Sequence, residues 1–418
     1  MATTIVMSSK LLGLSCYIAS ALIHLTIRRY KTTKRLLNDK NITAAIARIE
    51  TTIQRDEGKR GIGPLCIQGE LANAAESIMK AKRIAIITGF PCLLDFSPPT
   101  ETDGPLGALA IARACLALGK RVFIVTDECN EDVVLGSAAA ADLNKGFTEN
   151  CDKSQNDGSS ISSKYLEGRL EEGEEEVEDE VDIYDEKEEQ LLTCESYPGG
   201  ANFTWKDDER LFDFAQNIDL VIAIERAGPS KDGTYRTMRK RDMTGIVAPL
   251  DRLITGDFAQ LYKEENYEAN IVDSIIEVHQ QRMKSIGIGD GGNEVGMGKV
   301  FDTVVKSSIP NAPDIACVTS CDSLITASVS NWGGYALAAA VALTATSEKY
   351  PVFFSIDEAV SRCMPNREQE TVICQRMVEC GGRDGMTAKN ELMVDGMPLE
   401  RSIEILEEIA DIALKANK

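Results

Sequence analysis

The residues best suited to chemistry lie together in one glycine-rich segment. Residues 287–298 read GIGDGGNEVGMG, six glycines in twelve positions, with Asp290, Asn293 and Glu294 between them. Glycines let a backbone turn sharply and bring its N–H groups close to an anion. The two carboxylates can transfer protons or bind a hard cation. A tight turn whose glycines only permit positive φ is the structural alternative, but six glycines favour a binding loop for a small anion.

The same segment contains a partial dinucleotide-binding pattern. Gly287, Gly289 and Gly292 spell G-x-G-x-x-G after an apolar run. However, Gly296 and Gly298 stand where a helix should begin, and the acidic residue nearest the required spacing, Asp314, precedes the next apolar run instead of ending it. A P-loop motif is absent as well. The sequence therefore predicts no organic cofactor. A nicotinamide oxidoreductase remains the third alternative, and NAD(P) binding would test it.

The elements that must position this loop alternate between strands and helices. Continuous apolar runs at 83–88, 121–128, 219–225 and 284–289 are typical of buried parallel strands. The run at 106–119 is apolar on all sides and ends on a glycine, which predicts a buried helix. This alternation predicts an α/β fold with a mainly parallel sheet and helices on both faces, a Rossmann-like body of three layers.

Further elements are expected in the second half of the chain. We expect a strand at 314–320 and helices at 205–216, 266–284, 331–346 and 399–416.

Polar side chains follow four of these strands. In open parallel sheets, ligands bind beyond the carboxyl ends of the strands. The ETDGP turn follows the first strand, and the other three end near Asp127, Glu225 with Arg226, and Asp290. Together they predict a cleft at that edge. Within ETDGP, Thr102 or Asp103 could cap the following helix, which leaves Glu101 free for chemistry.

The charge distribution divides the chain into four parts. The net charge is −21, but residues 167–189 alone carry fourteen acidic and two basic residues. We therefore predict an N-terminal extension over 1–47, the catalytic domain over 48–149 and 194–418, and a disordered acidic insertion over 150–193. The charge argues against nucleic acid as a partner. A homo-oligomer is compatible with the sequence.

The N-terminal extension contains no acidic residue before position 39. Its first 38 residues carry six Lys/Arg residues, and Leu11–Ile27 is uncharged for seventeen residues. This composition favours a targeting segment over a membrane anchor, because the apolar stretch is short and interrupted by polar residues. A non-native start to the chain is another reading. The cysteines form no CxxC pair, which is typical of reduced thiols in an intracellular protein.

Several motifs in order along the chain resemble the D-glutamate cyclase family. They are TGF at 88–90, ETDGPLGA, VTDE, ERAG with DGTYRTMR, the glycine-rich segment, SNWGGYAL at 330–337, and DGM followed by VDGM. The resemblance is to the domain that forms the C-terminal part of the mammalian mitochondrial enzyme. It covers residues 51–415 apart from the acidic insertion. It implies conversion of D-glutamate to 5-oxo-D-proline and water, a lyase reaction, and a mitochondrial location; a cytoplasmic or other organellar location is the alternative.

Hypothetical roles can be given to residues within these motifs. Glu225, Asp290 and Glu294 are the acid–base candidates. We expect the substrate to be bound by the loop residues Gly289, Gly291, Gly292 and Asn293, by Arg226 or Arg236, and by Ser330 and Asn331. A divalent cation, Mn²⁺ or Mg²⁺, would be held by two of Glu101, Asp127 and Asp290.

Two alternatives stay open at this point. One is a different lyase, or a lactam hydrolase, acting on a small amino or carboxylic acid in the same cleft. The other is a non-catalytic binding protein that uses its acidic segment as an interaction surface.

Overall fold

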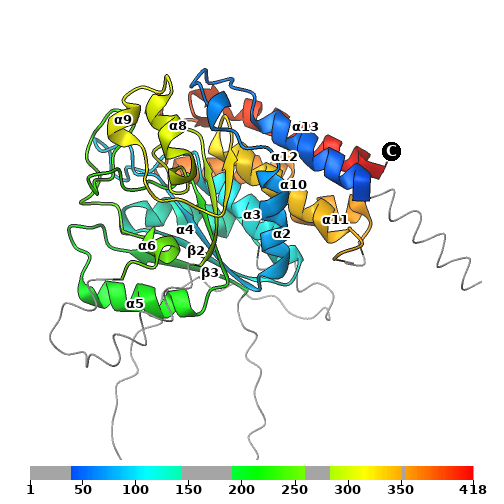
Figure 1. Ribbon diagram of the computed structural model, residues 1–418, viewed down its shortest axis with the longest axis horizontal. Helices are drawn as coiled ribbons and strands as arrows, with labels where there is room; N and C mark the ends of the chain where they lie inside the picture. Colours follow the sequence, from blue (N-terminus) through cyan, green and yellow to red (C-terminus); the bar gives the residue numbers. More distant parts are fainter. Residues whose placement is uncertain (1–38, 144–190, 259–282, 351–353, 418) are drawn as a thin grey trace, which may run out of the picture.

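The computed structural model describes residues 39–143, 191–258, 283–350 and 354–417. Its centre is a six-stranded parallel sheet in the order β3-β2-β1-β4-β5-β6 (Figure 1). The strands are β1 (Arg83–Thr88), β2 (Arg121–Asp127), β3 (Leu192–Tyr197), β4 (Leu220–Ile224), β5 (Lys284–Gly289) and β6 (Ser323–Thr326). The chain runs outward from β1 to β3 and returns to build β4 to β6 on the other side. The strand order therefore reverses between β1 and β4, which is where such sheets bind ligands.

Both faces of the sheet are buried because successive side chains of a strand point to opposite sides. In β1, Ile84 and Ile86 join the larger core, whereas Ala85 and Ile87 join the second one. Helices pack on each face, and the predicted three-layer α/β fold is confirmed.

The larger core contains most of the helices. They are the helix at 39–53 and α2 (Glu70–Lys80), α3 (Pro105–Ala117), α4 (Glu131–Ala141), α10 (Ser330–Ala345), α11 (Ile356–Cys363), α12 (Arg367–Glu379) and α13 (Leu399–Leu414). The second core is covered by α5 (Trp205–Gln216) and α6 (Arg252–Thr255).

Short elements complete the described chain. They are the helices α8 (Phe301–Lys306) and α9 (Ala312–Ile315), the 3-10 turns Gly63–Leu65, Glu128–Asn130, Gly298–Val300 and Lys415–Asn417, and the hairpin β7–β8 (Met393–Val394, Met397–Pro398).

Two boundaries differ from the sequence prediction. The helix at 39–53 begins inside the expected extension, because Ile42, Ala45 and Ile46 are buried in the larger core. It runs beside α13 (Figure 1). At the acidic segment, the edge strand β3 begins at Leu192, two residues before the expected boundary, because it pairs with β2. The remainder of that segment lies outside the described residues.

The expected strand at 314–320 is wrong. Residues 312–315 form α9, which has Pro313 in its first turn, and the sixth strand is β6. The apolar residues after α9 pair with loops instead of the sheet: the Cys317 N–H donates to the Gly292 carbonyl, and the Val318 N–H to Pro229. The helix expected at 266–284 lies almost wholly outside the described residues.

Disulfide bonds and membrane-spanning helices are both absent from the described ranges. Every cysteine there is a free thiol. None of the helices there has both the length and the apolar character needed to cross a bilayer.

Candidate active site

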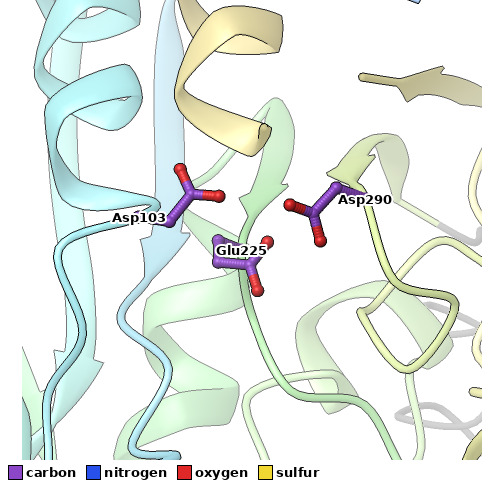
Figure 2. Close-up of side chains that lie close together, drawn as sticks. All are labelled: Asp103, Glu225 and Asp290. Atoms are coloured by element: carbon purple, nitrogen blue, oxygen red, sulfur yellow. The ribbon is translucent and has the colours of Figure 1, made fainter. Parts of the chain in front are cut away.

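Three carboxylates meet at the point where the strand order reverses. Asp103 lies in the turn between β1 and α3, Glu225 directly follows β4, and Asp290 directly follows β5. All three side chains are buried, and one oxygen of each lies within 4.8 Å of the others. Figure 2 shows them pointing toward one another from three separate segments. Among the described residues, this is a group spaced closely enough to hold a metal ion.

Asp103 is held in place by the start of α10. Its carboxylate accepts the backbone N–H groups of Ser330 at 2.9 Å and Asn331 at 2.8 Å. The capping role expected for Asp103 is therefore real but serves a different helix. The start of α3 is capped in return by Asn331, whose Oδ1 accepts the N–H groups of Gly104 and Gly107 at 2.9 and 2.8 Å.

Glu225 adopts a backbone conformation that is unusual for a residue with a side chain. Its φ is +39°, in the left-handed region, and such strain is often found at functional sites. The Ser330 hydroxyl donates to Glu225 Oε2 at 2.6 Å. A Cβ on Gly104 would lie 2.8 Å from the Glu225 Cβ, so the ETDGP turn needs glycine there to admit this side chain.

The glycine-rich loop binds its own carboxylate. Glu294 Oε1 accepts the Gly291 N–H at 2.6 Å, and Oε2 accepts the Gly292 N–H at 2.7 Å. Gly292 makes this possible with a φ of +95°. We expected these amides to bind the substrate, but Glu294 already satisfies them. Asn293 lines the cavity and donates to the carbonyl of Arg236 at 2.9 Å.

Arg60 is the main site residue that the sequence analysis missed. Its guanidinium donates to Asp290 Oδ1 at 2.6 Å and forms an ion pair with Asp395 in the β7–β8 turn. Arg60 lies in the segment RDEGKRGIG at 55–63, whose polar and glycine residues alone are typical of a surface loop. The only related motif in the sequence is VDGM, which contains Asp395, but the motif does not indicate that Asp395 pairs with Arg60.

Burial favours the neutral form of these crowded carboxyls. Desolvation and the charge of Asp290 raise the pKa of Asp103 to about 7, although two backbone N–H donors oppose this. The same two causes raise the pKa of Glu294 to about 7 and that of Glu225 well above its usual range. Burial also raises the pKa of Asp290, but the Arg60 charge opposes the rise. Several carboxyls at the inner end can thus exchange protons near neutral pH.

These groups line a cavity of about 440 Å³ whose wall carries both acidic and basic side chains. Its acidic lining residues are Glu101, Asp103, Glu225, Asp290, Glu294 and Asp395. Its basic lining residues are Lys59, Arg60, Arg239 and Arg241; Arg60 is half-buried, and the other three are exposed and therefore belong to the mouth of the cavity. Such a cavity suits a small ligand that carries both charges.

Five expected ligands lie away from this cavity. Arg226 and Asp127 are both buried and bind each other through two hydrogen bonds of 2.5 and 2.7 Å, so neither is available to a substrate or cation. Arg236 pairs with Asp232 and lines a separate surface hollow. Ser330 and Asn331 are fully buried and position carboxylates instead of lining the cavity.

Gly289 and Glu101 complete the expected set. Gly289 ends β5, and a Cβ there would lie 3.0 Å from the Glu294 side chain, so this glycine gives Glu294 room. Glu101 lines the cavity and is buried. Burial and the charges of Asp103 and Asp290 raise its pKa well above the usual range.

Comparisons with known proteins agree with the arrangement. The human protein "D-glutamate cyclase, mitochondrial" (Homo sapiens) is 29% identical to this chain over 382 residues, which is 88% of this chain and 52% of the human protein. The chain thus spans about half the length of this curated relative. A family model described as "D-glutamate cyclase-like, C-terminal" matches residues 49–260 and 264–410. That match covers most of the chain, the three carboxylates included, and the chain therefore belongs to the D-glutamate cyclase-like, C-terminal family.

Proposed function

We propose that this chain is a D-glutamate cyclase, which converts D-glutamate to 5-oxo-D-proline and water. The family match and the name of the human relative support the substrate and reaction. The observation that carries the proposal is the cavity itself, in which buried carboxyls face cationic side chains at the mouth. An amino dicarboxylate has the matching charges.

The reaction requires two proton transfers. The ammonium group of glutamate loses two protons, its nitrogen attacks the γ-carboxyl carbon, and the departing oxygen leaves as water with those two protons. No net proton is released and no covalent intermediate with the protein is needed. Ring closure is intramolecular, so holding the chain of glutamate folded supplies much of the rate.

We assign the proton transfers to Asp290 and Glu225. Arg60 contacts Asp290 at 2.6 Å and favours its ionised form, which makes it the base for the ammonium group. Glu225 contacts no described cation and accepts the Ser330 hydroxyl, and its burial favours the neutral form that can donate to the departing oxygen. Burial and the charge of Asp290 raise the pKa of both Asp103 and Glu294 to about 7, so each of these neighbours can carry a proton near neutral pH.

As the alternative to a proton on Glu225, we propose a divalent cation at the three carboxylates, which would then all be ionised. Asp103, Glu225 and Asp290 would hold Mn²⁺ or Mg²⁺, since hard cations prefer carboxylate oxygens. Asp290 Oδ2 is buried and has no hydrogen-bond partner among the described residues, as expected of a ligand atom. A bound cation would polarise the γ-carboxyl group. This set replaces the expected one, of which Asp290 is retained.

Product analysis of the full chain tests the reaction. D-glutamate and L-glutamate are incubated separately, with Mn²⁺, with Mg²⁺ and with chelator, and lactam is quantified. We expect 5-oxoproline from the D isomer. Asp290→Asn and Glu225→Gln should each lower the rate by roughly 100-fold or more, the usual contribution of an acid or base.

Asp314→Asn is the matched control for that experiment. Asp314 is exposed, pairs with Lys240 and lies outside the cavity, so its substitution should leave the rate unchanged. Absence of lactam in every arm of the experiment would overturn the reaction. Release of glutamate from 5-oxoproline without any reverse reaction would favour a hydrolase instead.

We further infer a mitochondrial location. The name of the human relative includes the word mitochondrial, and the first 38 residues of this chain contain basic residues and no acidic residue. Fluorescent fusions of the full chain and of residues 39–418 should differ in location, with only the full chain in mitochondria. Identical distributions would contradict this.

A further inference from the structure

The basic residues at the cavity differ in what they already bind. Arg60 is committed to Asp290 and Asp395. Arg241 is committed to Asp95 through two hydrogen bonds of 2.6 and 2.9 Å. Within the described residues, by contrast, the only acceptor for the Arg239 guanidinium is the Met386 carbonyl, at 3.3 Å. Most of the donors of Arg239 are therefore open to a ligand.

The turn that carries Arg239 is fixed on both sides. Thr237 Oγ1 accepts the N–H groups of Arg239 at 3.2 Å and Arg241 at 3.1 Å. Asn311 then donates to the Met238 carbonyl at 2.9 Å, which ties the tip of the turn to the loop before α9. These contacts fix the backbone from which the Arg239 side chain extends to line the cavity.

The charge of Arg239 reaches the cavity wall. Cys92 lines the cavity, and its thiol pKa is raised well above the usual range by burial and by the charges of Glu101 and Glu225. Arg239 opposes that rise. The guanidinium thus acts on the interior of the cavity as well as on its rim.

We propose that Arg239 binds the α-carboxylate of the substrate and thereby selects amino acids that carry one. This deepens the proposed function and rests on it for the identity of the substrate. The planar guanidinium fork matches a carboxylate. With the α-carboxylate on Arg239, the ammonium and γ-carboxyl groups would be directed to Asp103, Glu225 and Asp290, whose side chains Figure 2 shows close together.

The compound 4-aminobutyrate makes the test sharp. It is glutamate without the α-carboxylate, and it can close to a lactam by the same chemistry. For Arg239→Gln we expect kcat/KM for D-glutamate to fall about 10- to 100-fold, mostly through KM, because a hydrogen bond to a charged group is lost. The rate with 4-aminobutyrate should stay unchanged. Arg239→Lys should restore part of the loss.

Lys240→Gln is the matched control, since it removes the same charge from the next residue. Lys240 pairs with Asp314 and does not line the cavity. The ratio of the two substrates should stay within about threefold of the wild-type ratio in this variant. The assignment would be overturned if Arg239→Gln lowered activity toward D-glutamate and 4-aminobutyrate equally. It would also be overturned if Lys240→Gln changed the ratio of the two activities as much as Arg239→Gln does.

Calorimetry separates this proposal from the reaction itself. If the wild-type chain forms no lactam, binding of D-glutamate and 4-aminobutyrate is compared directly. If the wild-type chain binds D-glutamate more tightly than 4-aminobutyrate, and Arg239→Gln abolishes that difference, then Arg239 binds the α-carboxylate even though the proposed reaction is wrong. Equal affinities of the wild-type chain for the two compounds would show that Arg239 does not bind the α-carboxylate.

Discussion

Asp103 and Asn331 cap each other's helices. The Asp103 carboxylate accepts two N–H groups at the start of α10, and Asn331 Oδ1 accepts two at the start of α3. The two residues are far apart in the sequence, and their exchange joins the turn between β1 and α3 to the second half of the domain. Every atom involved is buried, so the exchange fixes the orientation of one of the three carboxylates.

Removing one side of this exchange should be costly. Asn331→Ala leaves the Gly107 N–H without its partner in the interior and leaves the Gly104 N–H with only Asp103 Oδ1, at 3.0 Å, which predicts a loss of about 2–4 kcal/mol in the free energy of unfolding. Urea unfolding measures it. The control is Asn366→Ala, an exposed cap of α12 expected to cost about 1 kcal/mol. Equal losses in the two variants would contradict the prediction.

The helices α3 and α10 approach so closely that glycine is needed at their contact. A Cβ on Gly334 would lie 2.4 Å from the Gly107 Cα, a contact that the backbones must separate to relieve. Gly334→Ala should therefore destabilise the protein by about 3 kcal/mol or more, since overpacking moves backbone.

Gly245→Ala is the matched comparison for Gly334→Ala. A Cβ on Gly245 would meet only the Ala201 Cβ, at 3.7 Å, an ordinary contact. This variant should stay within about 0.5 kcal/mol of wild type in the same urea unfolding experiment. Similar midpoints for the two variants would show that the helices can separate cheaply.

The buried pair of Arg226 and Asp127 should act on stability and not on substrate affinity. Arg226→Met leaves Asp127 buried and without its cation, which should cost about 3–5 kcal/mol. Arg55→Met breaks the half-exposed pair with Glu408 and should cost at most about 1 kcal/mol. Thermal unfolding at one pH compares them. A rise in KM without loss of stability in Arg226→Met would return Arg226 to the list of substrate ligands.

Glu370 should make stability depend on pH. Burial raises its pKa to about 7, although the Tyr335 hydroxyl that donates to it opposes the rise. Because the folded pKa is higher than the unfolded one, the proton on Glu370 stabilises the fold at low pH. This contribution, about 3 kcal/mol, is complete below about pH 4.5 and is lost as the pH rises through about 7.

The variant Glu370→Gln isolates that contribution. The difference in unfolding free energy between wild type and variant should fall as the pH rises from 4.5 to 7.5. Glu368→Gln, an exposed change on the same helix, should give a difference that stays flat. A flat difference for Glu370→Gln as well would contradict the prediction.

Much of the fold could be read from local pattern. The strands β1, β2, β4 and β5 are continuous apolar runs, and their burial on two faces follows from the layers that cover them. Their polar ends then placed Glu225 and Asp290 at one edge of the sheet. The run after α9 misled the prediction, because apolar residues that pack under a loop look like a strand in sequence.

The sequence by itself determined which residue types follow each strand, and therefore which acids gather where the strand order reverses. Only the tertiary structure decided their partners. Arg226 follows β4 and looked available, yet it is sealed against Asp127, whereas Arg60, 230 positions from Asp290, reaches the site. Local sequence fixes backbone propensity and side-chain chemistry. The environment of a charge depends on groups that are near in space and distant in the chain, and that environment sets which charges are free to act.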